Sequence, residues 1–132
     1  MAAKRGIKAA TRTAPKQPAQ KLGCVFFRTS SGNEPVRDWL KDDVPGEARK
    51  IIGADIKTVQ EMWPIGKPLV DGLGDGLWEV RSTHDGIEYR VIFVLNGGAM
   101  VLLHGFVKKT QKTARQDKDL AMSRKATLEG AK

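Results

Sequence analysis

The chain has 132 residues, enough for one domain of ordinary size, and 40% of them are hydrophobic. Its 23 Lys and Arg outnumber 15 Asp and Glu, which gives a formal net charge of +8. No apolar run approaches the roughly 20 residues of a membrane span, which excludes a membrane-spanning protein. The single cysteine excludes a disulfide framework, and one cysteine with two histidines makes no metal cluster. We therefore expect a small, soluble, basic domain in a reducing compartment, the cytoplasm.

The first 22 residues form a basic segment without acids. They hold six Lys or Arg and are rich in Ala, Thr, Pro and Gln, with little to bury. This composition is typical of a disordered arm, and no apolar stretch follows the basic residues as it does in a signal peptide. We predict a basic arm at 1–22 and one folded domain at 23–132.

Periodicity predicts a strand and a short helix at the start of the domain. The apolar run 24–28 lies between Gly23 and a turn cluster at 30–33, which is typical of a strand. Asn33 is a favourable N-cap, and the apolar residues after it recur at helical spacing.

A second helix is predicted to begin near the Asp42–Asp43 pair and Pro45. Its apolar stripe extends from Ala48 to Trp63, and Pro64 ends it. The Gly- and Pro-rich segment from Pro64 to Gly76 is predicted to be a loop.

The apolar period then changes from helical spacing to alternation. Residues 77–81, 87–95 and 99–107 are rich in β-branched and aromatic residues, and turn signals separate them at 85–86 and 96–98. Three strands joined by short turns predict an antiparallel meander.

A last helix is predicted to begin at Thr113, because Gln116 three residues later completes a capping box. Its apolar stripe is weak. The predicted order is β-α-α-β-β-β-α, an α+β domain with the first two helices on one face of a mostly antiparallel sheet.

Strand alternation places Arg81 with Glu79 and Arg90 with Glu88 on shared faces. The simpler interpretation is a pair of solvated or salt-bridged arginines, with the two glutamates as partners. The alternative is a cationic floor on an exposed sheet face that binds phosphates through paired hydrogen bonds.

Basic residues continue after the third meander strand, at Lys108, Lys109, Lys112 and Arg115. Such a run is most often a soluble surface. With Phe106 next to it, the run also suits a nucleobase stacked on an aromatic ring beside bound phosphate.

His104 lies in an apolar stretch, so a half-buried histidine with a satisfied ring is favoured over a general base. No base is placed near Cys24 or the Ser30–Ser31 pair. The sequence therefore gives no support for nucleophilic catalysis.

Three segments carry a resemblance to a known family, namely Gly76–Arg81, Tyr89–Val91 and Leu102–Thr110. In their order and spacing the chain resembles the RelE/HigB toxins of type II toxin–antitoxin systems, particularly the phage-associated HigB-like branch. The resemblance covers about residues 24 to 126. It implies a RelE-like fold, ribosome-dependent cleavage of mRNA and neutralisation by a helix-turn-helix antitoxin.

The resemblance also implies chemistry without a metal, cofactor or protein nucleophile. In this family the 2′-hydroxyl of the RNA attacks the adjacent phosphate, so the protein stabilises negative charge and moves protons. Carried over to this chain, Arg90 is expected to stabilise transition-state charge and Arg81 to position phosphate. Lys108 and Lys109 match the basic pair after the last strand, and Lys67 is a candidate for holding RNA.

This sequence departs from the family at two places. Leu77 and Glu79 stand where some relatives have lysines, and residues 109–132 contain no tyrosine. The general base therefore stays open among His104, Glu79 and Lys109.

Two other functions fit the same residues. The missing lysines and tyrosine favour somewhat a non-catalytic ParE-like toxin that acts on DNA gyrase, and the basic arm allows a simple nucleic-acid-binding module. For the ribonuclease, we expect Arg90→Ala to abolish toxicity and leave the fold intact.

Overall fold

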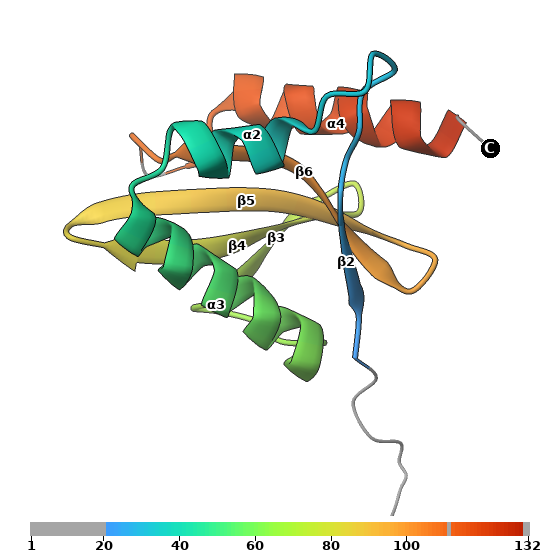
Figure 1. The fold of residues 1–132 in the computed structure, drawn as a ribbon. Coiled ribbons are helices and arrows are strands. Elements are labelled where there is room, and N and C mark those ends of the chain that lie inside the picture. The colour runs from blue at the N-terminus through green and yellow to red at the C-terminus, as the bar shows by residue number, and fades with distance from the viewer. Residues whose placement is uncertain (1–20, 111, 131–132) are drawn as a thin grey trace, which may run out of the picture.

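A five-stranded sheet between two helical layers forms the part of the chain that the computed structural model describes, residues 21–110 and 112–130. Figure 1 shows α2 and α3 on one side of the sheet and α4 on the other. The α+β class and the packing of the first two helices on one face are confirmed. The elements, in chain order, are β2 (Gly23–Phe26), α2 (Pro35–Asp42), α3 (Gly46–Met62), β3 (Val70–Gly74), β4 (Leu77–His84), β5 (Ile87–Asn96), β6 (Ala99–Val107) and α4 (Arg115–Gly130).

Most of the predicted arm, residues 1–20, lies outside the described residues. Leu22 already belongs to the fold, because its backbone N–H donates to the carbonyl of Gln60 at 2.9 Å. None of the helices in the described ranges has the length and hydropathy needed to cross a bilayer.

The sheet order is β2-β6-β5-β4-β3. β2 runs parallel to β6, and the other neighbours are antiparallel. The predicted meander of β4, β5 and β6 is confirmed. Its turns use Asp85–Gly86 and Gly97–Gly98, all with positive φ, as two-residue hairpin turns require.

The predicted loop after α3 contains a strand that the sequence pattern missed. β3 pairs with β4 at the sheet edge, so the order β-α-α-β-β-β-α is wrong by one strand. The strand has only five residues, and its register shifts between Gly72 and Gly74. Two glycines and a bulge in so short a segment hide the alternation that marks a strand.

The predicted helix starts are also corrected. Helix α2 begins after Glu34 rather than Asn33, and α3 begins after Pro45; neither cap residue makes a side-chain cap hydrogen bond. The Thr113 hydroxyl donates to Glu79 at 2.7 Å instead of capping α4, which begins at Arg115. Tertiary contacts thus replace the local capping that the sequence suggested.

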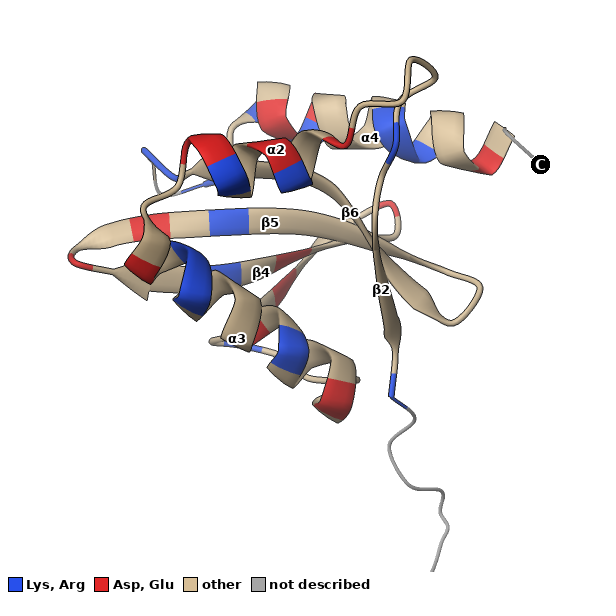
Figure 2. Ribbon diagram, viewed as in Figure 1, with Lys and Arg blue, Asp and Glu red and all other residues tan. Residues whose placement is uncertain are grey.

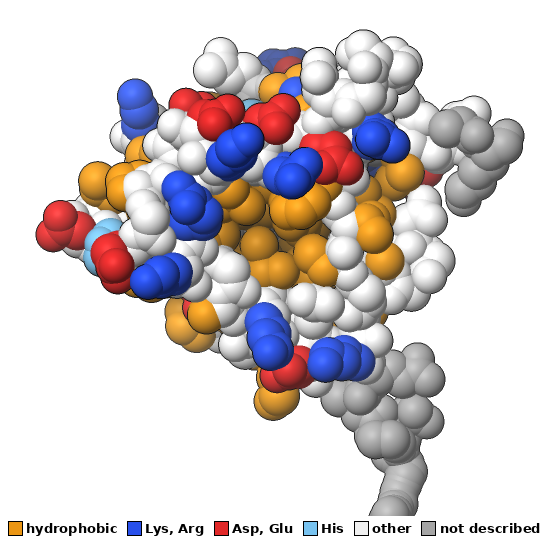
Figure 3. Space-filling view, in the orientation of Figure 1, with side chains coloured by type: hydrophobic (Ala, Val, Ile, Leu, Met, Phe, Trp, Pro, Cys, Tyr) orange, Lys and Arg blue, Asp and Glu red, His pale blue; other side chains and the backbone are white. Residues whose placement is uncertain are grey.

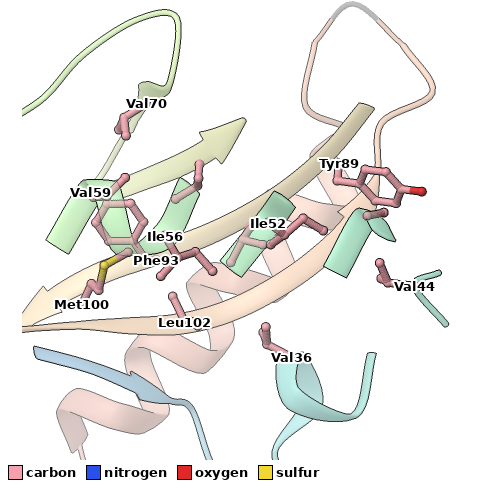
Figure 4. Close-up of a cluster of buried hydrophobic side chains, with 13 residues drawn as sticks. Val36, Val44, Ile52, Ile56, Val59, Val70, Tyr89, Phe93, Met100 and Leu102 are labelled. Atoms are coloured by element: carbon pink, nitrogen blue, oxygen red, sulfur yellow. The ribbon is translucent and has the colours of Figure 1, made fainter. Parts of the chain in front are cut away.

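Two hydrophobic clusters hold the three layers together. Residues of α3 and of the facing strands form the larger one, of which Figure 4 shows Ile52, Ile56, Val59 and Phe93. The smaller one lies on the other face, where Ala121 of α4 packs over Ile92 and Val94. The burial of Ile92 and Val94 on one face and Phe93 on the other follows the predicted alternation of β5.

Trp39 of α2 lies directly on the backbone of β6 at Gly105. A Cβ atom at Gly105 would stand 2.3 Å from Cε3 of Trp39, which real contacts do not allow. The glycine therefore lets α2 approach the sheet.

We predict that Gly105→Ala lowers the free energy of unfolding by about 1–3 kcal/mol, because Trp39 must be displaced. Urea denaturation measures the change. Gly53→Ala is the matched control: no atom lies within 4 Å of the added methyl, and removing a glycine from a helix interior gains about 0.5–1 kcal/mol. Equal stability of Gly105→Ala and the wild type would contradict the assigned role of Gly105.

Candidate functional site

Charged side chains of β4 and β5 gather on the sheet face that α4 covers, toward the end of the sheet beyond the helix. Arg81 on β4 lies directly opposite Arg90 on β5, and Phe106 on β6 lies opposite Arg90 on its other side. Glu79 and Glu88 share this face with the arginines. Figure 2 shows acidic and basic bands next to one another on both strands.

Arg90 is not on an exposed surface, since only 1% of it is accessible. Its guanidinium lies 3.9 Å (Nε) from Oε2 of Glu79 and donates through Nη2 to Glu88 and through Nη1 to the carbonyl of Tyr89. The salt-bridged interpretation of this arginine is therefore the one that the structure matches. In this conformation the Arg90 side chain pairs with the carboxylates of Glu79 and Glu88 and does not face solvent.

Glu79 is the buried carboxylate of this network, at 3% exposure. Its Oε1 accepts the hydroxyl of Thr113, from the segment before α4, at 2.7 Å. The buried carboxylate thus ties the segment after β6 to the sheet.

Arg81 and Lys108 converge on two adjoining hollows. One, of about 640 Å³, is also lined by Glu88 and Lys109. The other, of about 330 Å³, is also lined by Lys112. A group bound between the two side chains would therefore meet cations from β4 and from the end of β6.

These cations are available to an external anion. Within the described part of the chain, no ion pair involves Arg81, Lys108, Lys109 or Lys112. Arg81 and Lys108 are half-buried, and Lys109 and Lys112 are exposed. Half-buried cations bind a phosphate more strongly than fully solvated ones, because water screens them less.

Glu88 is the site residue that sequence reasoning left out as a proton acceptor. Its side chain is 50% exposed and lines the same hollow as Arg81, Lys108 and Lys109. The alternation of β5 placed it on the correct face, but periodicity could not distinguish this accessible glutamate from the buried Glu79.

His104 matches the simpler of its two interpretations. Its Nε2 lies 2.7 Å from Oδ1 of Asp117, and its ring stacks on Phe106 with centroids 5.3 Å apart. Neither the hollow with Lys109 and Glu88 nor the hollow with Lys112 includes the histidine. The pair attaches α4 to β6.

A third hollow, of about 460 Å³, extends from the two lysines after β6 to Trp39 and Phe106. Phe106 and Lys112, which stay candidate substrate contacts, thus lie beside Lys108 and Lys109. The other two candidates are elsewhere: Lys67 pairs with Asp71 at 3.8 Å and Arg115 with Asp119 at 3.6 Å, and neither lines any of these hollows.

Cys24 lies on β2, away from this region. Burial raises the pKa of its thiol, which keeps it in the unreactive protonated form.

The fold and these hollows define a class: a small α+β domain whose sheet carries, among the described residues, several cations without an ion pair. A scan against protein families matches residues 38–126 to the phage-derived protein Gp49-like family (DUF891). The chain belongs to this family, one of the RelE/HigB-like toxin families of toxin–antitoxin systems. A search of curated proteins gave no match.

The burial of Arg90 changes the expectation for its replacement. Arg90→Ala would leave Glu79 buried without its cation, so we predict a loss of about 3–5 kcal/mol from the free energy of unfolding. Arg81→Ala, at a half-exposed position without an ion pair in the described residues, should change it by no more than about 0.5 kcal/mol. Urea denaturation compares the two. Similar stability of both variants would contradict the structural role of Arg90.

Proposed function

We propose that the protein is the toxin of a type II toxin–antitoxin system and a metal-independent endoribonuclease that cleaves mRNA on the ribosome. The observation that carries this proposal is the convergence of Arg81 and Lys108, without ion pairs in the described residues, on two adjoining hollows. Family membership supports the toxin class. The resemblance to RelE/HigB toxins supports the reaction and the ribosome as its setting.

The reaction needs two proton transfers and one charge to be stabilised. The 2′-oxygen of the RNA forms a bond to the adjacent phosphorus while the bond from phosphorus to the 5′-oxygen breaks. The products are a 2′,3′-cyclic phosphate and a free 5′-hydroxyl. Arg81 and Lys108 stabilise the negative charge on the phosphate oxygens.

Glu88 is the proton acceptor that the geometry favours for the 2′-hydroxyl, because its carboxylate lines the hollow of these cations. Lys109 lines the same hollow and can donate a proton to the leaving 5′-oxygen. Lys112 and Phe106 extend the contact surface along the RNA, and Arg90 with Glu79 holds the strands in register. His104, committed to Asp117, is a positioning residue for α4.

The antitoxin is the proposed partner, a small helix-turn-helix protein that neutralises the toxin. The antitoxin would bind the folded domain. Membership of a toxin family supports the existence of such a partner. Ribosomal RNA is the second proposed partner, because the residues 81–132 hold ten Lys or Arg against five Asp or Glu.

We predict that Arg81→Ala and Lys108→Ala each lower cleavage of a translated reporter message by about 10²–10³-fold, with little loss of stability. Primer extension after induction locates the cut sites. Lys50→Ala, which removes an exposed lysine of α3, is the matched control and should cleave like the wild type. Wild-type cleavage by both site variants would refute the proposed site.

Glu88→Gln keeps the hydrogen bond to buried Arg90 but removes the basic carboxylate. We therefore predict about 10²–10⁴-fold slower cleavage by the folded variant. Glu129→Gln, an exposed change on α4, controls for the loss of one charge. If Glu88→Gln cleaves at the wild-type rate, another group accepts the proton.

The state of the messages also distinguishes the proposed ribonuclease from the alternative function, a ParE-like toxin that acts on DNA gyrase. DNA breaks and a damage response with intact messages would assign the chain to gyrase poisoning, as in the ParE branch. A deoxynucleotide at the cut site blocks RNA cleavage, because the 2′-hydroxyl is the nucleophile.

A further inference from the structure

A fourth hollow lies at the edge of β4, where the chain before β3 turns away from that strand. The backbone N–H of Arg81 donates to the carbonyl of Leu69 at 2.8 Å, and beyond Arg81 no strand of the described chain pairs with β4 on this side. The hollow has a volume of about 360 Å³. It is distinct from the apolar groove between α2, α3 and β2, lined by Phe26, Leu40 and Gly53, whose hydrophobic side chains are visible at the centre of Figure 3.

Asp55 of α3 gives the fourth hollow a carboxylate that the proposed reaction does not use. The hydroxyl of Ser82 donates to its Oδ2 at 2.7 Å, and because Ser82 is buried, this bond fixes the position of the carboxylate. No ion pair within residues 21–110 and 112–130 involves Asp55. A half-buried carboxylate without a cation favours a ligand that brings N–H groups to it.

Two residues connect this hollow to the proposed site of RNA cleavage. Arg81 and Glu88 line both the fourth hollow and the hollow of about 640 Å³ that contains Lys108 and Lys109. Lys109, the proposed proton donor to the leaving 5′-oxygen, lines only the second of these two. Since Glu88 is the proposed acceptor of the proton of the 2′-hydroxyl, the nucleotide that carries this hydroxyl is the one whose base can enter the fourth hollow.

We propose that the fourth hollow binds a guanine base on the 5′ side of the cleaved bond and that Asp55 selects it. This inference rests on the RNA cleavage proposed above. The Watson–Crick edge of guanine carries two neighbouring donors, N1–H and the N2 amino group, which match the two oxygens of a carboxylate. Adenine and cytosine place an acceptor nitrogen beside their amino group, and uracil has a carbonyl oxygen on each side of its N–H. Each of these three bases would therefore bring a lone pair against Asp55.

The other walls of the hollow suit the rest of a guanine base. Pro68 and Leu69 provide an apolar surface on which a flat ring can pack. The side chain of Thr83 is exposed, and its hydroxyl can donate to O6, the acceptor next to N1–H. The backbone N–H of Thr83 points to the same strand edge as that of Arg81, because alternate residues of a strand direct these groups the same way. The hollow thus offers an acceptor to the two donors of guanine and donors to its O6.

Nucleotide binding tests this base subsite without any need for cleavage. The probes are guanosine 3′-monophosphate and adenosine 3′-monophosphate, each titrated into the full-length protein in a calorimeter. We expect the wild type to bind the guanosine nucleotide at least about tenfold more tightly. Asp55→Asn should remove most of that preference, because it replaces one acceptor oxygen by a donor and keeps an oxygen for Ser82. Asp42→Asn, an exposed change at the end of α2, is the matched control and should keep the preference.

Two further variants separate recognition of the base from recognition of the phosphate. Thr83→Val, at an exposed position, should weaken the guanosine nucleotide by about two- to tenfold and leave the adenosine nucleotide unchanged. Arg81→Ala should weaken both nucleotides by the same factor, because both carry the phosphate. Equal affinity of the wild type for the two nucleotides, or an unchanged preference in Asp55→Asn, would overturn the proposal.

Cut sites distinguish a failure of this proposal from a failure of the proposed function. In the primer-extension assay the wild type should cut on the 3′ side of guanosine, and Asp55→Asn should lose this preference, whereas Lys108→Ala should lower cleavage at every site. Cleavage by the wild type without preference for guanosine would overturn the base subsite and leave the ribonuclease standing. Preferential binding of guanosine 3′-monophosphate without cleavage of any message would refute the ribonuclease and leave the base subsite standing.

Discussion

The buried guanidinium of Arg90 is the constraint on which the arrangement of the site depends. A charge in the interior is tolerated only when it is paired and hydrogen-bonded, so Glu79 and Glu88 are held where Arg90 needs them. Glu79 in turn accepts the hydroxyl of Thr113. One buried cation therefore determines the positions of two carboxylates and of the segment that leads into α4.

The cationic side chains on this face thus divide into two kinds. Arg90 is neutralised inside the sheet, and this pairing reduces the repulsion that Arg81, directly opposite on β4, would otherwise experience. Arg81 and Lys108 stay without an ion pair in the described ranges and remain open to solvent. A bound phosphate would neutralise the positive charges of Arg81 and Lys108, which no carboxylate of the described residues pairs with. Such cations, in place before the ligand binds, are the electrostatic basis of a preorganised site.

Strand alternation in the sequence predicted the meander, the sharing of faces and the cations that gather there, because side chains on long strands obey a period of two. It did not predict β3, whose two glycines and bulge remove that period. Nor could it tell that Arg90 is buried and Arg81 accessible, since both stand at equivalent positions on neighbouring strands. That difference depends on which strand end α4 and its preceding segment cover, a long-range property that local pattern does not contain.

Residues of helix α2 line two separate hollows. Its Leu40 and Lys41 line the apolar groove with Phe26 and Gly53. Trp39, the residue before Leu40, lines the hollow beside Phe106 and the lysines after β6. Because Trp39 rests on Gly105 without room for a methyl group, α2 cannot shift toward β6, and displacement away from it would enlarge that hollow.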